Sequence, residues 1–91
     1  MRTDTLLRIT IAALMRATDE TQTDLGAGIG LSQGQISRKM RADGTGSDWT
    51  LWDCDRLAAH YGIGVLDLLA GPDTALKRLD PRRLAATVGS Q

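Results

Sequence analysis

The sequence predicts an all-α domain of five helices with a short C-terminal extension. Its 91 residues suffice for one small domain. Along most of the chain, apolar residues recur at spacings of three and four, as on the buried face of a helix. Glycines and hydroxyl-bearing residues interrupt this spacing at intervals that suit short helices. The pattern shows no alternation typical of strands, so we expect helices alone.

The composition argues against a disulfide-linked, metal-binding or membrane-spanning protein. The chain has 42% hydrophobic residues and no Phe, so Leu, Ile, Ala and Met must build the core. Its single cysteine, Cys54, forms no internal disulfide, and no Cys/His cluster has metal-ligand spacing, so we expect neither metal nor other cofactor. No apolar run approaches the ~18 residues of a membrane span, and the N-terminus lacks a secretory pattern. A cytoplasmic protein without membrane contact is therefore expected.

The first helix is expected over about residues 3–17. Its core-facing stripe is predicted to be Leu7, Ile11 and Leu14. A second apolar stripe on the same helix consists of Leu6, Ile9 and Ala13. Either the C-terminal segment or a second subunit would cover this stripe, or its residues are simply exposed on the surface.

The second helix begins at Thr21, whose hydroxyl can accept from a backbone N–H of the first turn. Asp24 lies at the third helical position, near the positive end of the helix. Gly30 ends the helix in a left-handed conformation. Gly26 falls where the next helix would cross, so we expect its missing side chain to allow a close approach.

The third helix begins at Ser32, which forms a capping-box pattern with Gln35. Ile36 is its clearest inward residue. With Ile36 inward, Gln33 lies at the edge near the helix start. The residues that then point outward are Gly34, Ser37, Arg38 and Arg41.

The rest of the chain predicts a loop over 42–48 and two further helices. The fourth helix, over 50–61, should bury Leu51, Cys54, Leu57, Ala58 and Tyr61. The fifth, over 65–70, should bury Leu66 and Leu69. We therefore divide the chain into a domain of residues 1–71 and a partly helical tail of residues 72–91. In that tail, one or two turns are expected over 74–79, and Asp80-Pro81 would open another helix to about Val88.

A helix, a tight glycine turn and a second helix form a helix-turn-helix motif, here over residues 21–41. Net charge is zero, but it is unevenly distributed. No acid lies between Leu25 and Ala42, a stretch that contains Arg38, Lys39 and Arg41. Among the charged residues of 43–73, by contrast, six are aspartates and only Arg56 is basic. One basic and one acidic face would orient the protein on a polyanion, and the major groove of duplex DNA admits one helix.

The segment TQTDLGAGIGLSQGQISR resembles the helix-turn-helix of the lambda-repressor/Cro type, the XRE family. Its matching positions are Thr21, Gln22, Leu25, Gly30, Leu31, Ser32, Ile36 and Ser37. Downstream, similarity continues through Leu57-Ala58, Tyr61-Gly62-Ile63 and Val65-Leu66-Asp67-Leu68-Leu69. The likeness thus covers about Leu7 to Gly71 and implies a lambda-repressor-like DNA-binding domain.

The resemblance also implies roles for single residues. Those at base-reading positions are Gln33, Ser37 and Arg38, with Gly34 contributing only a close backbone approach. Those at DNA-backbone positions are Thr21, Gln22, Ser32, Gln35 and Arg41. Gln35 fits the capping box equally well. Gly34 and Lys39 depart from the family, which usually has a reading side chain at the first position and an apolar one at the second; Met40 can replace Lys39 inward, or the lysine stem can cover the core.

Together these expectations describe a sequence-specific regulator of transcription that binds double-stranded DNA, a repressor acting as a homodimer on a palindromic operator. The alternative is a protein-interaction module or antitoxin component of the same fold, with a protein partner bound through the tail. An enzyme is not expected, because we find no nucleophile–base pair, metal set or phosphate loop. His60 should be a surface or half-buried residue. For Trp49 and Trp52, core packing under the loop and a dimer contact both remain open.

Overall fold

The structure, a computed structural model, describes residues 2–41, 46 and 48–84. Within these residues it is all-helical, which confirms the predicted class, and no strand occurs there. The helices are α1 (Thr3–Thr18), α2 (Gln22–Ile29), α3 (Gln33–Lys39), α4 (Leu51–Tyr61), α5 (Val65–Leu69), α6 (Pro72–Arg78) and the short 3-10 helix η1 (Pro81–Arg83). None of the described helices has the length and apolar character needed to cross a membrane.

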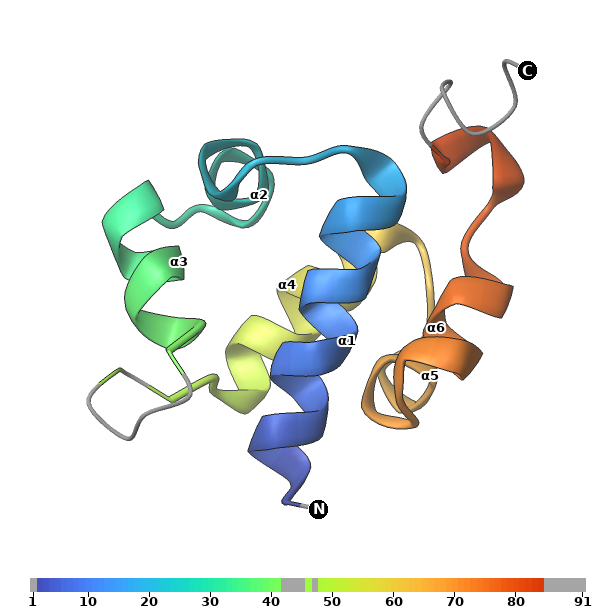
Figure 1. Ribbon diagram of the computed structural model, residues 1–91, viewed down its shortest axis with the longest axis horizontal. Coiled ribbons are helices and arrows are strands. Elements are labelled where there is room, and N and C mark those ends of the chain that lie inside the picture. The colour runs from blue at the N-terminus through green and yellow to red at the C-terminus, as the bar shows by residue number, and fades with distance from the viewer. Residues whose placement is uncertain (1, 42–45, 47, 85–91) are drawn as a thin grey trace.

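The helices are arranged around α1 and α4, which lie in the middle of the molecule (Figure 1). At one end, α2 packs against α3 and α4. At the other end, α5 and α6 pack against each other and against α1. The helix-turn-helix segment is therefore separated from the C-terminal helices by the central pair.

One continuous core joins these helices. From α1 it contains Leu7, Ile11 and Leu14, and from α2 and α3 it contains Leu25, Ile29 and Ile36. The predicted stripe of α1 and the inward position of Ile36 are thereby confirmed. On α4, Cys54, Leu57, Ala58 and Tyr61 are buried as expected.

Two leucines predicted to be buried are exposed instead. Leu51, in the first turn of α4, is 80% exposed, and the buried residue of that turn is Asp53. Leu66 of α5 is 82% exposed, while Leu68 is fully buried and Leu69 half-buried. Both predictions were wrong because a helix start or a five-residue helix offers too few turns for apolar spacing to fix its inner face.

The segment after Gly71 is part of this core. Helix α6 begins with Pro72 at its first position and packs against α1, where Ala75 and Leu79 are buried. It covers part of the second stripe of α1: Leu6 is half-buried, and a Cβ added at Gly71 would lie only 3.6 Å from a Leu6 methyl carbon. Ile9 of the same stripe is exposed.

After α6, Asp80 caps η1 by accepting from the Arg82 backbone N–H. A helix was expected to begin at Asp80-Pro81. Up to residue 84, where the description ends, the structure has only the single 3-10 turn of residues 81–83. The rest of that expectation, to Val88, lies outside the described residues.

Candidate nucleic-acid interface

Both helices of the motif begin at capping boxes, of which the one at Ser32 was predicted as a box and the one at Thr21 only as a hydroxyl cap. Thr21 Oγ1 accepts from the Asp24 N–H (3.1 Å), and Asp24 Oδ2 accepts from the Thr21 N–H (3.0 Å). Ser32 Oγ accepts from the Gln35 N–H (3.1 Å), and Gln35 Oε1 accepts from the Ser32 N–H (2.9 Å). Each box satisfies backbone donors that a helix start leaves without a partner. The capping interpretation of Gln35 is therefore confirmed.

A tight turn joins the two helices. Gly30 has φ +81°, the left-handed conformation predicted for it. The N–H groups of Gly30 and Leu31 both donate to the Gly26 carbonyl, at 2.8 and 2.9 Å. A Cβ at Gly26 would lie 2.3 Å from the Leu31 carbonyl oxygen. The close approach expected at Gly26 thus exists, but its partner is the turn before α3 and not α3 itself.

The first residues of α2 and α3 are joined by their side chains. Gln33 Nε2 donates to Gln22 Oε1 over 2.8 Å. Gln33 is exposed and Gln22 half-buried, so the pair lies at the surface where the two helices start. The bond fixes the direction of the Gln33 amide, a group that can both donate and accept, relative to α2.

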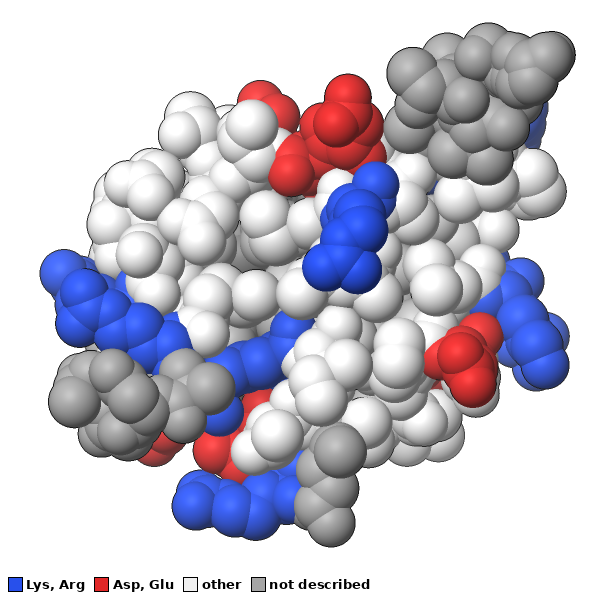
Figure 2. All heavy atoms as spheres, viewed as in Figure 1, with Lys and Arg blue, Asp and Glu red and all other residues white. Residues whose placement is uncertain are grey.

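The outer face of α3 brings together most of the predicted contact residues. Gly34, Arg38 and Arg41 are exposed, and Ser37 is half-buried. Opposite them, Ile36 is fully buried. Over α3, Figure 2 shows neutral and basic side chains, while acidic ones lie at the connection from α1 to α2, at the lower left of the view and over the C-terminal helices on the right. The structure therefore presents one acid-free helix face with two exposed guanidinium groups.

Lys39 does not belong to this face. Its ammonium lies 2.9 Å from Asp53 Oδ2 and donates to the Asp48 carbonyl (2.9 Å), and the two paired side chains are only 13% and 7% exposed. It also lies 5.7 Å from the centre of the Trp49 ring. Met40 packs against the core at half-burial. Met40 therefore takes the inward position, as one of the two alternatives expected, whereas the Lys39 ammonium does not reach outward but pairs with Asp53.

Asp53 is the site residue that sequence reasoning missed. It occupies the third position of α4, where its Oδ2 also accepts from the Thr50 N–H (3.0 Å) while Thr50 Oγ1 accepts from the Asp53 N–H (3.0 Å). The spacing Thr50-x-x-Asp53 carries that capping signal in the sequence, but its partner Lys39 is 14 residues away. One carboxylate therefore joins the start of α4 to the end of α3.

The end of α3 is also attached to α1. Arg8 Nε donates to the Lys39 carbonyl over 3.2 Å, and its guanidinium pairs with Asp4 at 3.3 Å. Arg2, Arg8 and Arg41 together line a polar hollow of about 300 Å³. Asp4 and Asp48 line the same hollow, so it carries charges of both signs, and spacing within the motif did not indicate it.

The two tryptophans have different environments. Trp49 is half-buried against the core, and its indole N–H is buried without a hydrogen-bond partner. Trp52 is 65% exposed, with the Arg56 guanidinium 5.3 Å from its ring centre. Arg56 donates to the Ile29 carbonyl at the end of α2 (3.1 Å). Of the two tryptophans for which core packing was one expectation, only Trp49 packs against the core.

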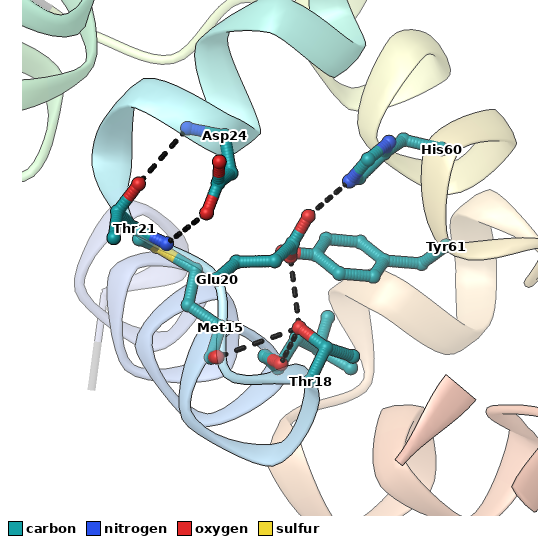
Figure 3. A network of polar contacts seen from close by, with 8 residues as sticks. Met15, Thr18, Glu20, Thr21, Asp24, His60 and Tyr61 are labelled. Atoms are coloured by element: carbon teal, nitrogen blue, oxygen red, sulfur yellow. Dashed lines mark hydrogen bonds and ion pairs between the residues drawn. The ribbon is translucent and has the colours of Figure 1, made fainter. Parts of the chain in front are cut away.

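Behind the motif, a half-buried acid joins α4 to the connection between α1 and α2 (Figure 3). Glu20 Oε2 lies 2.6 Å from His60 Nε2, and Glu20 Oε1 accepts from the Tyr61 hydroxyl (2.6 Å) and from Thr18 Oγ1 (2.9 Å). Burial, and next the Glu20 carboxylate, raise the pKa of the Tyr61 phenol far above its usual value. The expected half-buried place of His60 is confirmed. Its ring covers Gly28, where a Cβ would lie 2.4 Å away.

Within the described residues, no group of three or more His, Cys, Asp or Glu side chains is placed to hold a metal ion. Comparisons of the chain with protein-family models, with curated proteins and with solved structures give no match. Functional inference therefore depends on the geometry of α2, the turn and α3.

Proposed function

We propose that this chain is a sequence-specific regulator of transcription that binds double-stranded DNA with a lambda-repressor-like fold of the XRE type. The observation that carries the proposal is the Gln33–Gln22 bond at the edge of an acid-free, exposed α3 face. Such a pair aligns one amide for a base edge and another for the neighbouring phosphate. A cytoplasmic location on the nucleoid follows from this function.

In this proposal α3 enters the major groove. The Gln33 amide reads an adenine, and Arg38 reads a guanine or neutralises a phosphate, because these side chains match the donors and acceptors of those groups. Ser37 meets a base edge between them. The backbone contacts come from the helix starts and from the end of α3, namely Thr21, Gln22, Ser32, Gln35 and Arg41.

A single reading helix of seven residues touches few base pairs. Useful specificity over a genome then needs two copies of the domain on one site. We therefore propose a homodimer on a palindromic operator, with half-sites about one helical turn apart. Bound there, it would act as a repressor.

The second candidate is a protein-interaction module or antitoxin component that keeps the fold but binds a protein. Two observations favour it: the net charge of zero, and the exposed apolar residues Leu51 and Trp52 at the start of α4. A nucleic-acid binder usually has a basic excess. An exposed tryptophan is common in protein contacts.

Selection of bound duplexes from a random pool, at stated salt, separates the two candidates. A two-fold symmetric site supports both the regulator and the homodimer. Affinity that is equal for all sequences and falls steeply with salt leaves only nonspecific backbone binding.

Charge reversal then tests the reading face. Arg38→Glu and Arg41→Glu each place an acid against DNA, so we expect the affinity for the selected duplex to fall by about 10-fold or more, as for a lost contact of 1–3 kcal/mol with added repulsion. Lys77→Glu makes the same change of charge on the exposed surface of α6 and serves as the control. Unchanged duplex affinity in both arginine variants contradicts the proposed face.

A further inference from the structure

Among the glycines that the structure describes, Gly34 has no explanation inside the fold. A left-handed backbone accounts for Gly30, Gly62 and Gly71. Crowding accounts for Gly26, Gly28 and Gly46, where an added Cβ would lie within 2.4 Å of another atom, and at Gly64 the end of the Asp67 side chain would lie 3.1 Å from it. At Gly34 φ is not in the left-handed region, and the nearest atom to such a Cβ is Ser32 Oγ at 4.0 Å. The fold has room for a side chain there.

The absence of that side chain is unfavourable for α3. Glycine in a helix lowers stability relative to alanine because its unfolded backbone has more freedom to lose. Helix α3 has only seven residues, and it depends on its capping box and on the burial of Ile36 for its formation. Nothing that the structure describes inside the protein therefore requires glycine at this position.

Gly34 lies on the outer face of α3, exposed and beside Gln33. Ser37, one turn further, is also small. Helix Cα atoms lie about 2.3 Å from the axis, whereas side chains extend the radius to about 5–6 Å. The face is consequently lowest at Gly34, and the longer side chains of Gln33 and Arg38 stand on either side of it.

We propose that Gly34 receives the C5-methyl group of a thymine in the operator. This methyl is the apolar group that projects from base pairs into the major groove, and the Cα hydrogens of a glycine offer it an apolar contact that no side chain obstructs. The inference rests on the proposed DNA-binding function and deepens it: a notch between two reading side chains selects a base by shape.

Two changes, one on each molecule, test the contact. Replacing the critical thymine of the selected duplex by uracil removes only the methyl, and the wild-type protein should lose about three- to fourfold in affinity, the value of one buried methyl. Gly34→Ala should bind the thymine duplex about tenfold more weakly, as for one mismatched base pair. It should regain part of that loss on the uracil duplex, because the added methyl of the protein then occupies the empty space.

Thermal stability, measured beside affinity, distinguishes the proposed contact from a purely structural role of Gly34, because a structural role would make binding and stability change in the same direction. Gly34→Ala should raise the melting temperature by a few degrees while it weakens binding. Ala59→Gly, on the exposed side of α4, is the matched control and should lower the melting temperature without changing affinity.

The outcomes separate the two proposals. If the wild-type chain selects no duplex, the proposed function fails and this inference fails with it. If the wild type selects a duplex but Gly34→Ala binds it as tightly, or no thymine-to-uracil change in it alters wild-type affinity, the thymine contact is wrong and the regulator stands.

Discussion

At the scale of single residues, the Asp53 carboxylate takes part in two interactions at once. It caps α4 through Thr50 and neutralises the largely buried ammonium of Lys39. Burial opposes the charged form of Asp53, but the hydrogen bonds from Thr50 and Lys39 and the lysine charge outweigh it, so the pKa of Asp53 lies below its usual value. The junction between α3 and α4 is therefore strongest when this carboxylate is ionised.

Asp53→Asn should lower the free energy of unfolding by about 3 kcal/mol at neutral pH, because Lys39 is left nearly buried without a charged partner. A depressed folded pKa stabilises the fold above the unfolded pKa of about 4, and this contribution disappears as pH falls through the folded value. The wild type should thus lose more stability than Asp53→Asn between about pH 6 and pH 2. Urea unfolding across this range measures both effects.

Asp48→Asn is the control, because Lys39 contacts the backbone carbonyl of Asp48, which the substitution keeps. It should leave stability within about 0.5 kcal/mol. An Asp53→Asn protein as stable as the wild type at neutral pH would show that the pair contributes nothing.

The sequence marked Lys39 as unusual but did not locate its partner. Capping at Thr21 and Ser32 was predictable, because both members of each box lie within one turn. The Lys39–Asp53 contact crosses a loop and depends on how α4 packs. Pairings of this kind follow from tertiary geometry, which local spacing does not contain.

At the scale of helices and turns, the same distinction holds. The core-facing stripe of α1 was predicted correctly because its apolar spacing repeats along a helix of 16 residues. Helix α5 has five residues, so its inner residue is set by the neighbouring helices, and Leu68 is buried where Leu66 was expected. The motif was predictable because glycine and caps define its turn, whichever core lies beneath.

A substitution at Gly26 tests the close packing at the turn between α2 and α3. Gly26→Ala would place a methyl 2.3 Å from the Leu31 carbonyl, an atom of the backbone that cannot move without shifting the start of α3. We expect a loss of about 1–3 kcal/mol, as for overpacking in a core, although alanine favours helix. Thermal unfolding measures it. The matched change Gly34→Ala meets open space and should act in the opposite direction; equal effects at the two glycines contradict the assigned geometry.

At the scale of the whole molecule, the C-terminal segment completes the fold. Residues 72–91 were expected to form a tail because their local helix signals are weak. In the structure α6 lies along α1, away from α2 and α3, and contributes two buried residues, Ala75 and Leu79, to the core (Figure 1). Cover of the first helix by this segment was one of the alternatives that the sequence left open, and local propensity did not show which of its residues would be buried.

Leu79→Ala and Leu66→Ala compare a buried leucine of the C-terminal segment with the leucine that spacing wrongly predicted to be buried. Leu79 is buried, so its truncation should cost about 2–4 kcal/mol in urea unfolding followed by tryptophan fluorescence. Leu66 is 82% exposed, so its truncation should change stability by no more than about 0.5 kcal/mol. A larger loss at Leu66 that grows with protein concentration would mean that a second copy covers this side chain, and would place the dimer contact on α5. A concentration-independent loss would instead contradict the exposed position of Leu66.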